Sequence, residues 1–331
     1  MGRIFIDGFE HGHYGLWEAG GAGTVAITTA NAIDGDYSVS ITGRARISKS
    51  LGTTYNEIYL AGKFNFQGAA SIAVRHIFDL DKNTSRISSV RLSSNEVIHL
   101  YRQHVSISSA TAALSTNVNY RIEFHSKISS ANGIGKVLVN GETVIDFTSN
   151  TKAGVDDVDF NILRIGATYY INPIRLVDDI VIDTTVFPGK TKIMALVPDS
   201  SGGSTGWTPS TGENYACINE IPPTTVEGVS INTTGAVDLY NISALDSIAG
   251  EIKCIQISAL AETEGAPDAQ NLEIGIAHNN TAMFSAGLIP GTAGDPKYVT
   301  KLWENNPITA SAFTPSEISS LQIGIKATLT A

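Results

Sequence analysis

Histidine is the side chain that most often binds metals or moves protons near neutral pH. This chain has seven histidines, at positions 11, 13, 76, 99, 104, 125 and 278. His11 and His13 alternate on an extended segment and could hold a metal ion, but no third ligand is suggested nearby. His99 and His104 are five positions apart and would face opposite sides of one straight strand. We therefore expect His11 and His13 to be surface histidines in a turn region, and His99 and His104 to form no site by local spacing.

A second group with possible chemistry is the segment Asp79-Leu-Asp-Lys-Asn83, which resembles the start of a calcium loop. An EF-hand needs glycine at its sixth position and glutamate at its twelfth, whereas this chain has Thr84 and Val90 there. We reject an EF-hand and leave open a weak calcium site with a different arrangement of ligands.

Two further carboxylate clusters are Asp156-Asp157-Val-Asp159 and Asp178-Asp179. Paired carboxylates hydrolyse glycosidic bonds when they are held about 5–9 Å apart. Neighbouring residues on a strand point apart, so we interpret both clusters as solvated turns and strand edges.

Motifs for nucleotide or metal chemistry are absent: the sequence has no Walker-type, His-Glu-X-X-His or Cys-X-X-Cys pattern. Cys217 and Cys254 are too few for a disulfide framework and lack metal-site spacing. We expect both to be reduced, and one pairing between them stays open. The sequence thus predicts no catalytic, cofactor-binding or metal residues, no cofactor, and a protein that is not an enzyme.

The elements that must carry these residues are strands. In 57–66, Ile58, Leu60, Phe64 and Phe66 share one face, which is the two-residue period of a strand. Asn140-Gly141 predicts the tight turn of a hairpin over 136–147. Further strands are expected at 24–29, 37–42, 71–78, 86–92, 97–101, 105–108, 121–125, 160–165 and 174–182. Many short antiparallel strands between Gly, Asn and Ser turns predict an all-β fold that begins with a sandwich.

A boundary is expected near residue 190, giving a sandwich over 1–190 and a smaller β-rich domain over 191–331. We expect 191–197 to be the first strand of the second domain and the Gly- and Ser-rich 198–206 to be a long loop. Strands are predicted at 251–260, 272–276 and 321–325, the last two from a repeated Leu-X-Ile-Gly-Ile pattern. Short helical turns are expected at 244–248 and 315–319, the second with Thr314 and Glu317 as a capping box.

Composition and charge narrow the possible partners. Of 331 residues, 42% are hydrophobic and 16% charged, so the chain can bury cores. The net charge of −10 is divided into −1 for 1–190 and −9 for 191–331. This acidity argues against nucleic acid as a partner. No apolar run is long enough for a membrane span, and the first residues lack a signal-peptide core, so we expect synthesis in a cytosol.

Four segments together suggest a family: Gly2–Glu10, Glu57–Phe66, Val137–Asp146 and Leu176–Ile182. They resemble the concanavalin A/laminin-G-like jelly-roll superfamily and, more narrowly, structural proteins of tailed bacteriophages. The segments Trp207–Pro223 and Gly235–Tyr240 are similar to the C-terminal part of such virion proteins. The glucanase branch of the superfamily carries a Glu-X-Asp-X-Glu strand, which this chain lacks.

The resemblance implies a non-enzymatic virion structural protein, either capsid decoration or tail-associated, with capsid and tail left open. It would reside in the virion, dock onto other virion proteins through its acidic second domain, and be a homo-oligomer. The alternative is a carbohydrate-binding receptor module of a phage tail that contacts host glycan, for which Tyr59, Tyr101, Tyr169 and Tyr170 are available. A polysaccharide-degrading enzyme is disfavoured because the carboxylate triplet is missing.

Overall fold

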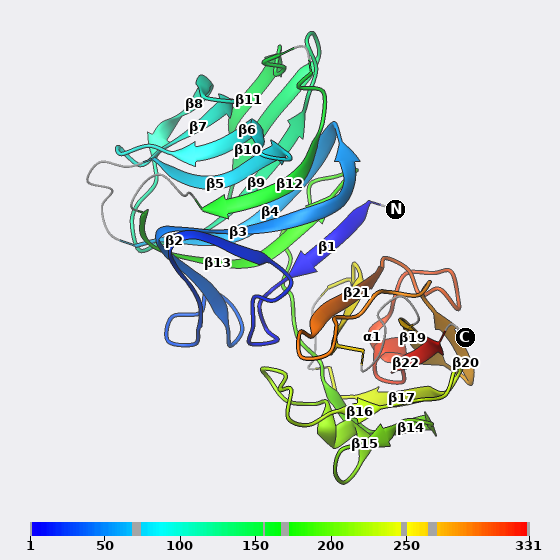
Figure 1. Cartoon of the computed structure of the whole chain (residues 1–331). Coiled ribbons are helices and arrows are strands. Elements are labelled where there is room, and N and C mark those ends of the chain that lie inside the picture. Colours follow the sequence, from blue (N-terminus) through cyan, green and yellow to red (C-terminus); the bar gives the residue numbers. More distant parts are fainter. Residues whose placement is uncertain are drawn as a thin grey trace. The chain divides into compact units, whose positions relative to one another are not determined.

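A computed structural model describes residues 2–67, 74–154, 156–166, 172–245, 250–263 and 270–329. The chain divides into two compact units, Met1–Met194 and Ala195–Ala331 (Figure 1). Antiparallel strands dominate both units, so the predicted all-β class is confirmed, with a jelly-roll sandwich followed by a smaller β-rich domain. Within these described ranges, no helix has the length and apolar character needed to cross a membrane.

The first unit is built on one antiparallel sheet that curls into a sandwich. Its order is β11-β10-β9-β4-β13-β3-β12-β5-β6-β7-β8, and the two ends of this order, β8 and β11, contact each other. The strands are β1 (Arg3–Asp7), β2 (Glu18–Thr28), β3 (Ser38–Tyr55), β4 (Glu57–Phe66), β5 (Arg75–Lys82), β6 (Ser85–Leu92), β7 (Val97–Arg102), β8 (Val105–Ala113), β9 (Asn119–Lys127), β10 (Gly133–Val139), β11 (Glu142–Ser149), β12 (Phe160–Gly166) and β13 (Asn172–Asp183). The long β3 links the two layers, because its first part pairs with β13 and its second part with β12.

The core of this unit lies between the layers. Ile58, Leu60, Phe64 and Phe66 of β4 are all buried, as their spacing predicted. Phe64 packs edge-on against Phe78 of β5, with ring centroids 5.3 Å apart. Burying each such side chain stabilises the fold by about 1.5–3 kcal/mol. The predicted hairpin turn is also present, since Asn140 and Gly141 both have positive φ, 53° and 93°.

The second unit holds a five-stranded antiparallel sheet in the order β14-β17-β22-β19-β20 and two separate strand pairs, β15-β16 and β18-β21. Its elements are β14 (Pro198–Thr205), β15 (Thr208–Pro209), the 3-10 helix η1 (Asn214–Cys217), β16 (Val229–Ser230), β17 (Val237–Ile242), β18 (Ile255–Ala261), β19 (Gln270–His278), β20 (Thr281–Phe284), β21 (Lys297–Trp303), α1 (Pro315–Ile318) and β22 (Gln322–Leu329). Ile274, Ile276 and Val299 lie in its apolar core.

Two predictions at the start of this unit are wrong. Residues 191–197 form no strand, and the predicted loop 198–206 is mostly strand β14. Ser201 of β14 pairs with Tyr240 of β17. A Gly- and Ser-rich segment can form a strand here because the ladder uses backbone groups that every residue carries.

Smaller predictions in the second unit have mixed outcomes. The strand predicted from 251 begins at Ile255. The turn at 315–319 is present as α1, and Thr314 and Glu317 form the predicted capping box. Most of the other expected helical turn, 246–248, lies outside the described residues. Cys217 and Cys254, which the structure does describe, are not joined by a disulfide.

Candidate functional site

The outward face of β12, β5, β6 and β7 carries polar side chains in a line across the sheet. Strand register places Arg164 opposite Asp79, Asp79 opposite Ser89, and Ser89 opposite Tyr101. The residues between them on these strands, such as Phe78, belong to the core. Because successive side chains of a strand point to opposite faces, the polar line lies on the side away from the core. We call this surface the polar face.

Asp79 is buried at the centre of the polar face. Its Oδ2 lies 2.7 Å from Nδ1 of His76 and 3.0 Å from Nη2 of Arg86. His76 and Asp79 can meet because the register shifts between His76 and Phe78, which inserts Ile77 as a bulge. Burial by itself would raise the pKa of Asp79, but His76, Arg86 and Arg91 outweigh it and hold the pKa below its ordinary value.

A second ion pair lies beside the first. Asp81, also buried, pairs with Arg164, and Nη2 of Arg164 donates to the backbone oxygen of Asn83 at 3.1 Å. Burial and the nearby guanidinium of Arg46 lower the pKa of Arg164. Arg46 comes from β3, so the two arginines reach this place from segments more than a hundred residues apart.

Arg91 and Tyr101 form the other end of the polar face. Nε of Arg91 donates to the Ser89 hydroxyl at 2.9 Å, and Nη2 donates to the Gln103 carbonyl at 2.7 Å. The guanidinium lies over the Tyr101 ring, 4.1 Å from its centroid. The His99 ring is 6.1 Å from that of Tyr101, and both side chains are half-buried. A phenol and an imidazole are therefore accessible beside a fixed positive charge.

Burying several charges on the outside of a sheet does not serve stability. Desolvating an ion pair costs about as much as its attraction returns, so apolar residues would hold the sheet together equally well. Ionisable groups with shifted pKa values gathered in one place are instead typical of functional sites. The polar face is therefore the candidate site of this unit.

The candidate residues singled out in the sequence lie apart from one another. Nε2 of His11 is 3.4 Å from Asp7, and His13 stacks on Tyr14. The predicted calcium-like segment belongs to strand β5, where both aspartates face arginine. Across the part of the chain that the structure describes, no three His, Cys, Asp or Glu side chains are grouped to hold a metal.

The solvated interpretation of Asp178 and Asp179 is wrong, because both are buried. Oδ2 of Asp178 accepts from the Ser38 hydroxyl at 2.8 Å, and Lys63 pairs with Asp179 and with Asp34. The strand does not alternate regularly here, since Asp179 has a positive φ of 45° and the register shifts at this point. Two neighbouring carboxylates can therefore be buried together.

The four tyrosines considered for sugar contact divide into three cases. Tyr59 stacks on His125 with centroids 4.0 Å apart, and Phe187 packs edge-on against it, so it is part of a packed cluster. Tyr101 lies on the polar face. Tyr169 and Tyr170 lie outside the described residues.

The sequence contains a signal for the polar face. In 78–81 and 89–92, the polar residues Asp79, Asp81, Ser89 and Arg91 alternate with apolar ones. That pattern indicates strands with one polar face. The pattern does not show which strands lie beside each other, because the order of strands depends on pairing between distant segments.

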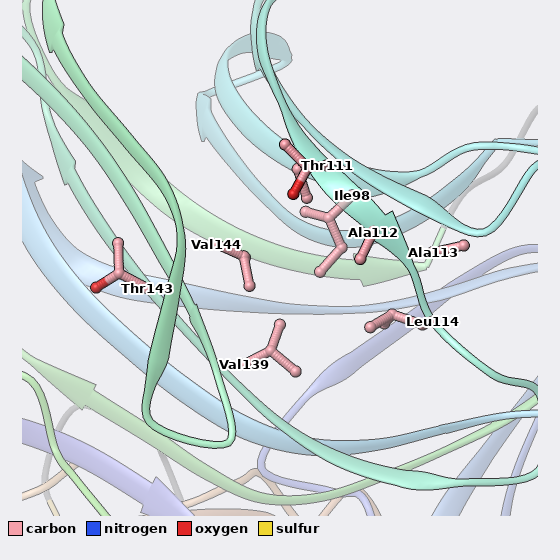
Figure 2. Close-up of a pocket in the computed structure, with 9 residues that line it drawn as sticks. Ile98, Thr111, Ala112, Ala113, Leu114, Val139, Thr143 and Val144 are labelled. Atoms are coloured by element: carbon pink, nitrogen blue, oxygen red, sulfur yellow. The ribbon is translucent and has the colours of Figure 1, made fainter.

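A separate cavity of about 170 Å³ opens between β8 and the β10–β11 hairpin. Figure 2 shows Ile98, Thr111 and Ala112 on one side of it and Val139, Thr143 and Val144 on the other. Its lining is apolar apart from the two threonines, so it holds no group that could act as an acid, a base or a nucleophile.

The strand order of the first unit defines an all-β jelly-roll sandwich. Among solved structures, the chain is similar to an endo-β-1,4-glucuronan lyase from the fungus Trichoderma reesei, with 16% identity and a TM-score of 0.46 over 55% of this chain and 96% of that one. It is also similar to the cellulose induced protein Cip1, with 18% identity and a TM-score of 0.45 over 56% of this chain and 100% of that one.

A third neighbour is domain 4 of an extracellular GH43 arabinanase from Geobacillus stearothermophilus, solved with arabinotriose, at 13% identity and a TM-score of 0.42 over 55% of this chain and 92% of that one. At such values the likeness concerns the fold, and each activity is that neighbour's own. No protein-family model matches the sequence. No curated protein matches it either.

These neighbours correct the function predicted from sequence. Most are carbohydrate-active enzymes, an alginate lyase and sialidases among them, and none of those named is a virion component. The prediction of a non-enzymatic virion structural protein that acts by docking is therefore contradicted, and so is the prediction that the chain is not an enzyme. The jelly-roll part of the resemblance stands, because it depends on strand patterns that the structure contains.

Proposed function

We propose that the first unit binds a carbohydrate polymer across its polar face. The observation that carries this proposal is the line of Arg164, Asp79, Ser89 and Tyr101 on four adjacent strands. Neighbouring strands are about 4.8 Å apart, so the line is roughly 14 Å long. Asp79 and Ser89 in the middle of the line are buried, and Arg164 and Tyr101 at its ends are half-buried. Accessible groups this far apart suit an extended chain of sugar rings better than a compact small molecule.

The side chains of the strip supply the contacts that sugars need. Guanidinium, imidazole and hydroxyl groups exchange hydrogen bonds with ring hydroxyls. Tyr101 adds an aromatic ring whose apolar surface can pack on the C–H face of a sugar. Tyr101 is held by its contact with Arg91, so little side-chain freedom is lost when a ligand binds.

Binding is tested by titrating the full chain with soluble polysaccharides and following heat or NMR shifts. Replacing Tyr101 with alanine should weaken binding about tenfold, which corresponds to about 1.4 kcal/mol. The matched control is Tyr120→Ala, because Tyr120 belongs to β9 in the other layer. If no polysaccharide binds, or if both variants lose affinity equally, the polar face is not the binding surface.

A second function, cleavage of the bound polymer, is favoured by one observation: His99 and Tyr101 lie side by side next to the Arg91 guanidinium. An imidazole and a phenol can move protons, and a fixed cation stabilises negative charge that develops on a substrate. Incubation with each bound polysaccharide should then release new chain ends. Tyr101→Phe should abolish that release while binding persists. If the native protein leaves the polymer intact, cleavage is excluded and binding alone is the function.

A further inference from the structure

The polar face contains more positive than negative groups. Arg46, Arg86, Arg91 and Arg164 are gathered there with three carboxylates: Asp79, Asp81 and, at the edge opposite Ser48, Glu18. His76 does not change this balance near pH 7, because burial lowers its pKa and keeps it neutral. One positive charge is therefore left over on a strongly desolvated surface.

Three arginines of this face also have unused hydrogen-bond donors. The Nε atoms of Arg46, Arg86 and Arg164 are buried, and within the described residues none of them has a hydrogen-bond partner. Buried donors are almost always satisfied, because an unsatisfied one has lost its hydrogen bonds to water without a replacement. These Nε atoms are closed off from solvent, so an acceptor from outside the unit would meet the terminal nitrogens of these half-buried arginines instead.

The two buried aspartates hold the arginines in place for that acceptor. Asp79 pairs with Arg86, and Asp81 pairs with Arg164. Asp81 and the Asn83 carbonyl engage the two terminal nitrogens of Arg164, and Asp79 engages Nη2 of Arg86. Within the described residues Arg46 forms no ion pair. Planar guanidinium groups recognise carboxylate and sulfate oxygens with two parallel hydrogen bonds, which a neutral hydroxyl cannot match.

We infer that the ligand of the polar face is an anionic polysaccharide, whose carboxylate or sulfate groups bind Arg46, Arg86 and Arg164. This inference rests on the proposed carbohydrate binding and names the class of sugar. Asp79 and Asp81 are positioning residues, because they orient Arg86 and Arg164 and do not themselves touch the ligand.

The test measures the affinity of the full chain for three polymers of matched length. A polyuronate presents carboxylate groups, dextran sulfate presents sulfate groups, and dextran is the neutral polymer. We expect one anionic probe to bind at least about tenfold more tightly than dextran, with an affinity that falls as salt is raised. The anionic probe that binds more tightly identifies the group recognised.

Variants separate recognition of charge from folding. Arg46→Gln should weaken binding of the anionic probe about tenfold and weaken binding of dextran much less. Arg164→Lys keeps the charge beside Asp81 but loses the planar fork, and it should weaken the anionic probe by a similar factor. The matched control is Lys136→Gln, which removes one charge from β10 in the other layer and should change nothing.

The outcomes distinguish the two proposals. Equal binding of all three probes would overturn the anionic ligand and leave carbohydrate binding in place. Binding of none would overturn both. Equal losses in Arg46→Gln and Lys136→Gln would show that general surface charge, and not these arginines, attracts the polymer.

Discussion

His76 and Asp79 face each other on the same side of strand β5, with Nδ1 of the histidine 2.7 Å from Oδ2 of the aspartate. Residues three apart on a regular strand point to opposite faces. The bulge at Ile77 removes that alternation locally and brings the pair together. A single extra residue thus determines the centre of the polar face.

Asp79→Asn tests how much the buried ion pair between Asp79 and Arg86 contributes to the free energy of unfolding. The amide would leave the Arg86 guanidinium without its buried carboxylate, and breaking a buried ion pair in this way costs about 3–5 kcal/mol. We expect earlier unfolding in denaturant and faster hydrogen exchange in β5 and β6. The control is Asp146→Asn, since Asp146 forms a surface pair with Lys136 that is worth less than about 1 kcal/mol. Equal effects of the two variants would contradict a buried network.

The buried carboxylate Asp178 should make the stability of the first unit depend on pH. Burial and the neighbouring Asp179 raise the pKa of Asp178 from 3.8 to about 8. The folded state therefore holds a proton that the unfolded chain releases near pH 4. The stability from that proton is fully present below about pH 4 and is lost as the pH rises toward 8.

Asp178→Asn should flatten this dependence, because an amide does not titrate. The maximum slope removed is about 1.4 kcal/mol per pH unit for one proton. Hydrogen exchange of peptides from β4, which pairs with β13, measured from pH 5 to 8 reports the change for this unit alone. The control Asp146→Asn should leave the slope of stability against pH unchanged. If Asp178→Asn keeps the slope of the native protein, Asp178 is ionised over the whole pH range.

Gly275 and Gly324 lie directly opposite each other on β19 and β22. The ring of Phe284 covers Gly275, where an added Cβ would approach it to 2.5 Å and the Met283 carbonyl to 2.7 Å. Gly275→Ala should therefore destabilise the second unit by about 1–3 kcal/mol, measured as a shift of its unfolding transition. Gly228→Ala is the control, because nothing lies within 4 Å of its Cβ position. A neutral Gly275→Ala would mean that Phe284 moves aside freely.

Local patterns in the sequence predicted much of the fold. Alternating apolar residues located β4, Asn140-Gly141 located a hairpin turn, and Thr314 with Glu317 located a capping box. Each of these features depends on residues within a few positions of one another, so one sequence contains the whole cause. The repeated Leu-X-Ile-Gly-Ile pattern predicted two strands, but not that their glycines would face each other.

The tertiary structure alone decided what depends on distant partners. Pairing with β17 turned the Gly- and Ser-rich 198–205 into a strand. Packing buried Asp178 beside Ser38 and Lys63, and the order β3-β12-β5-β6 brought Arg46, Arg164 and Arg86 onto one face. The physical reason is that register and bulges are set by the best burial of whole sheets. The sequence by itself therefore determined strands and turns, and their pairing decided the candidate site.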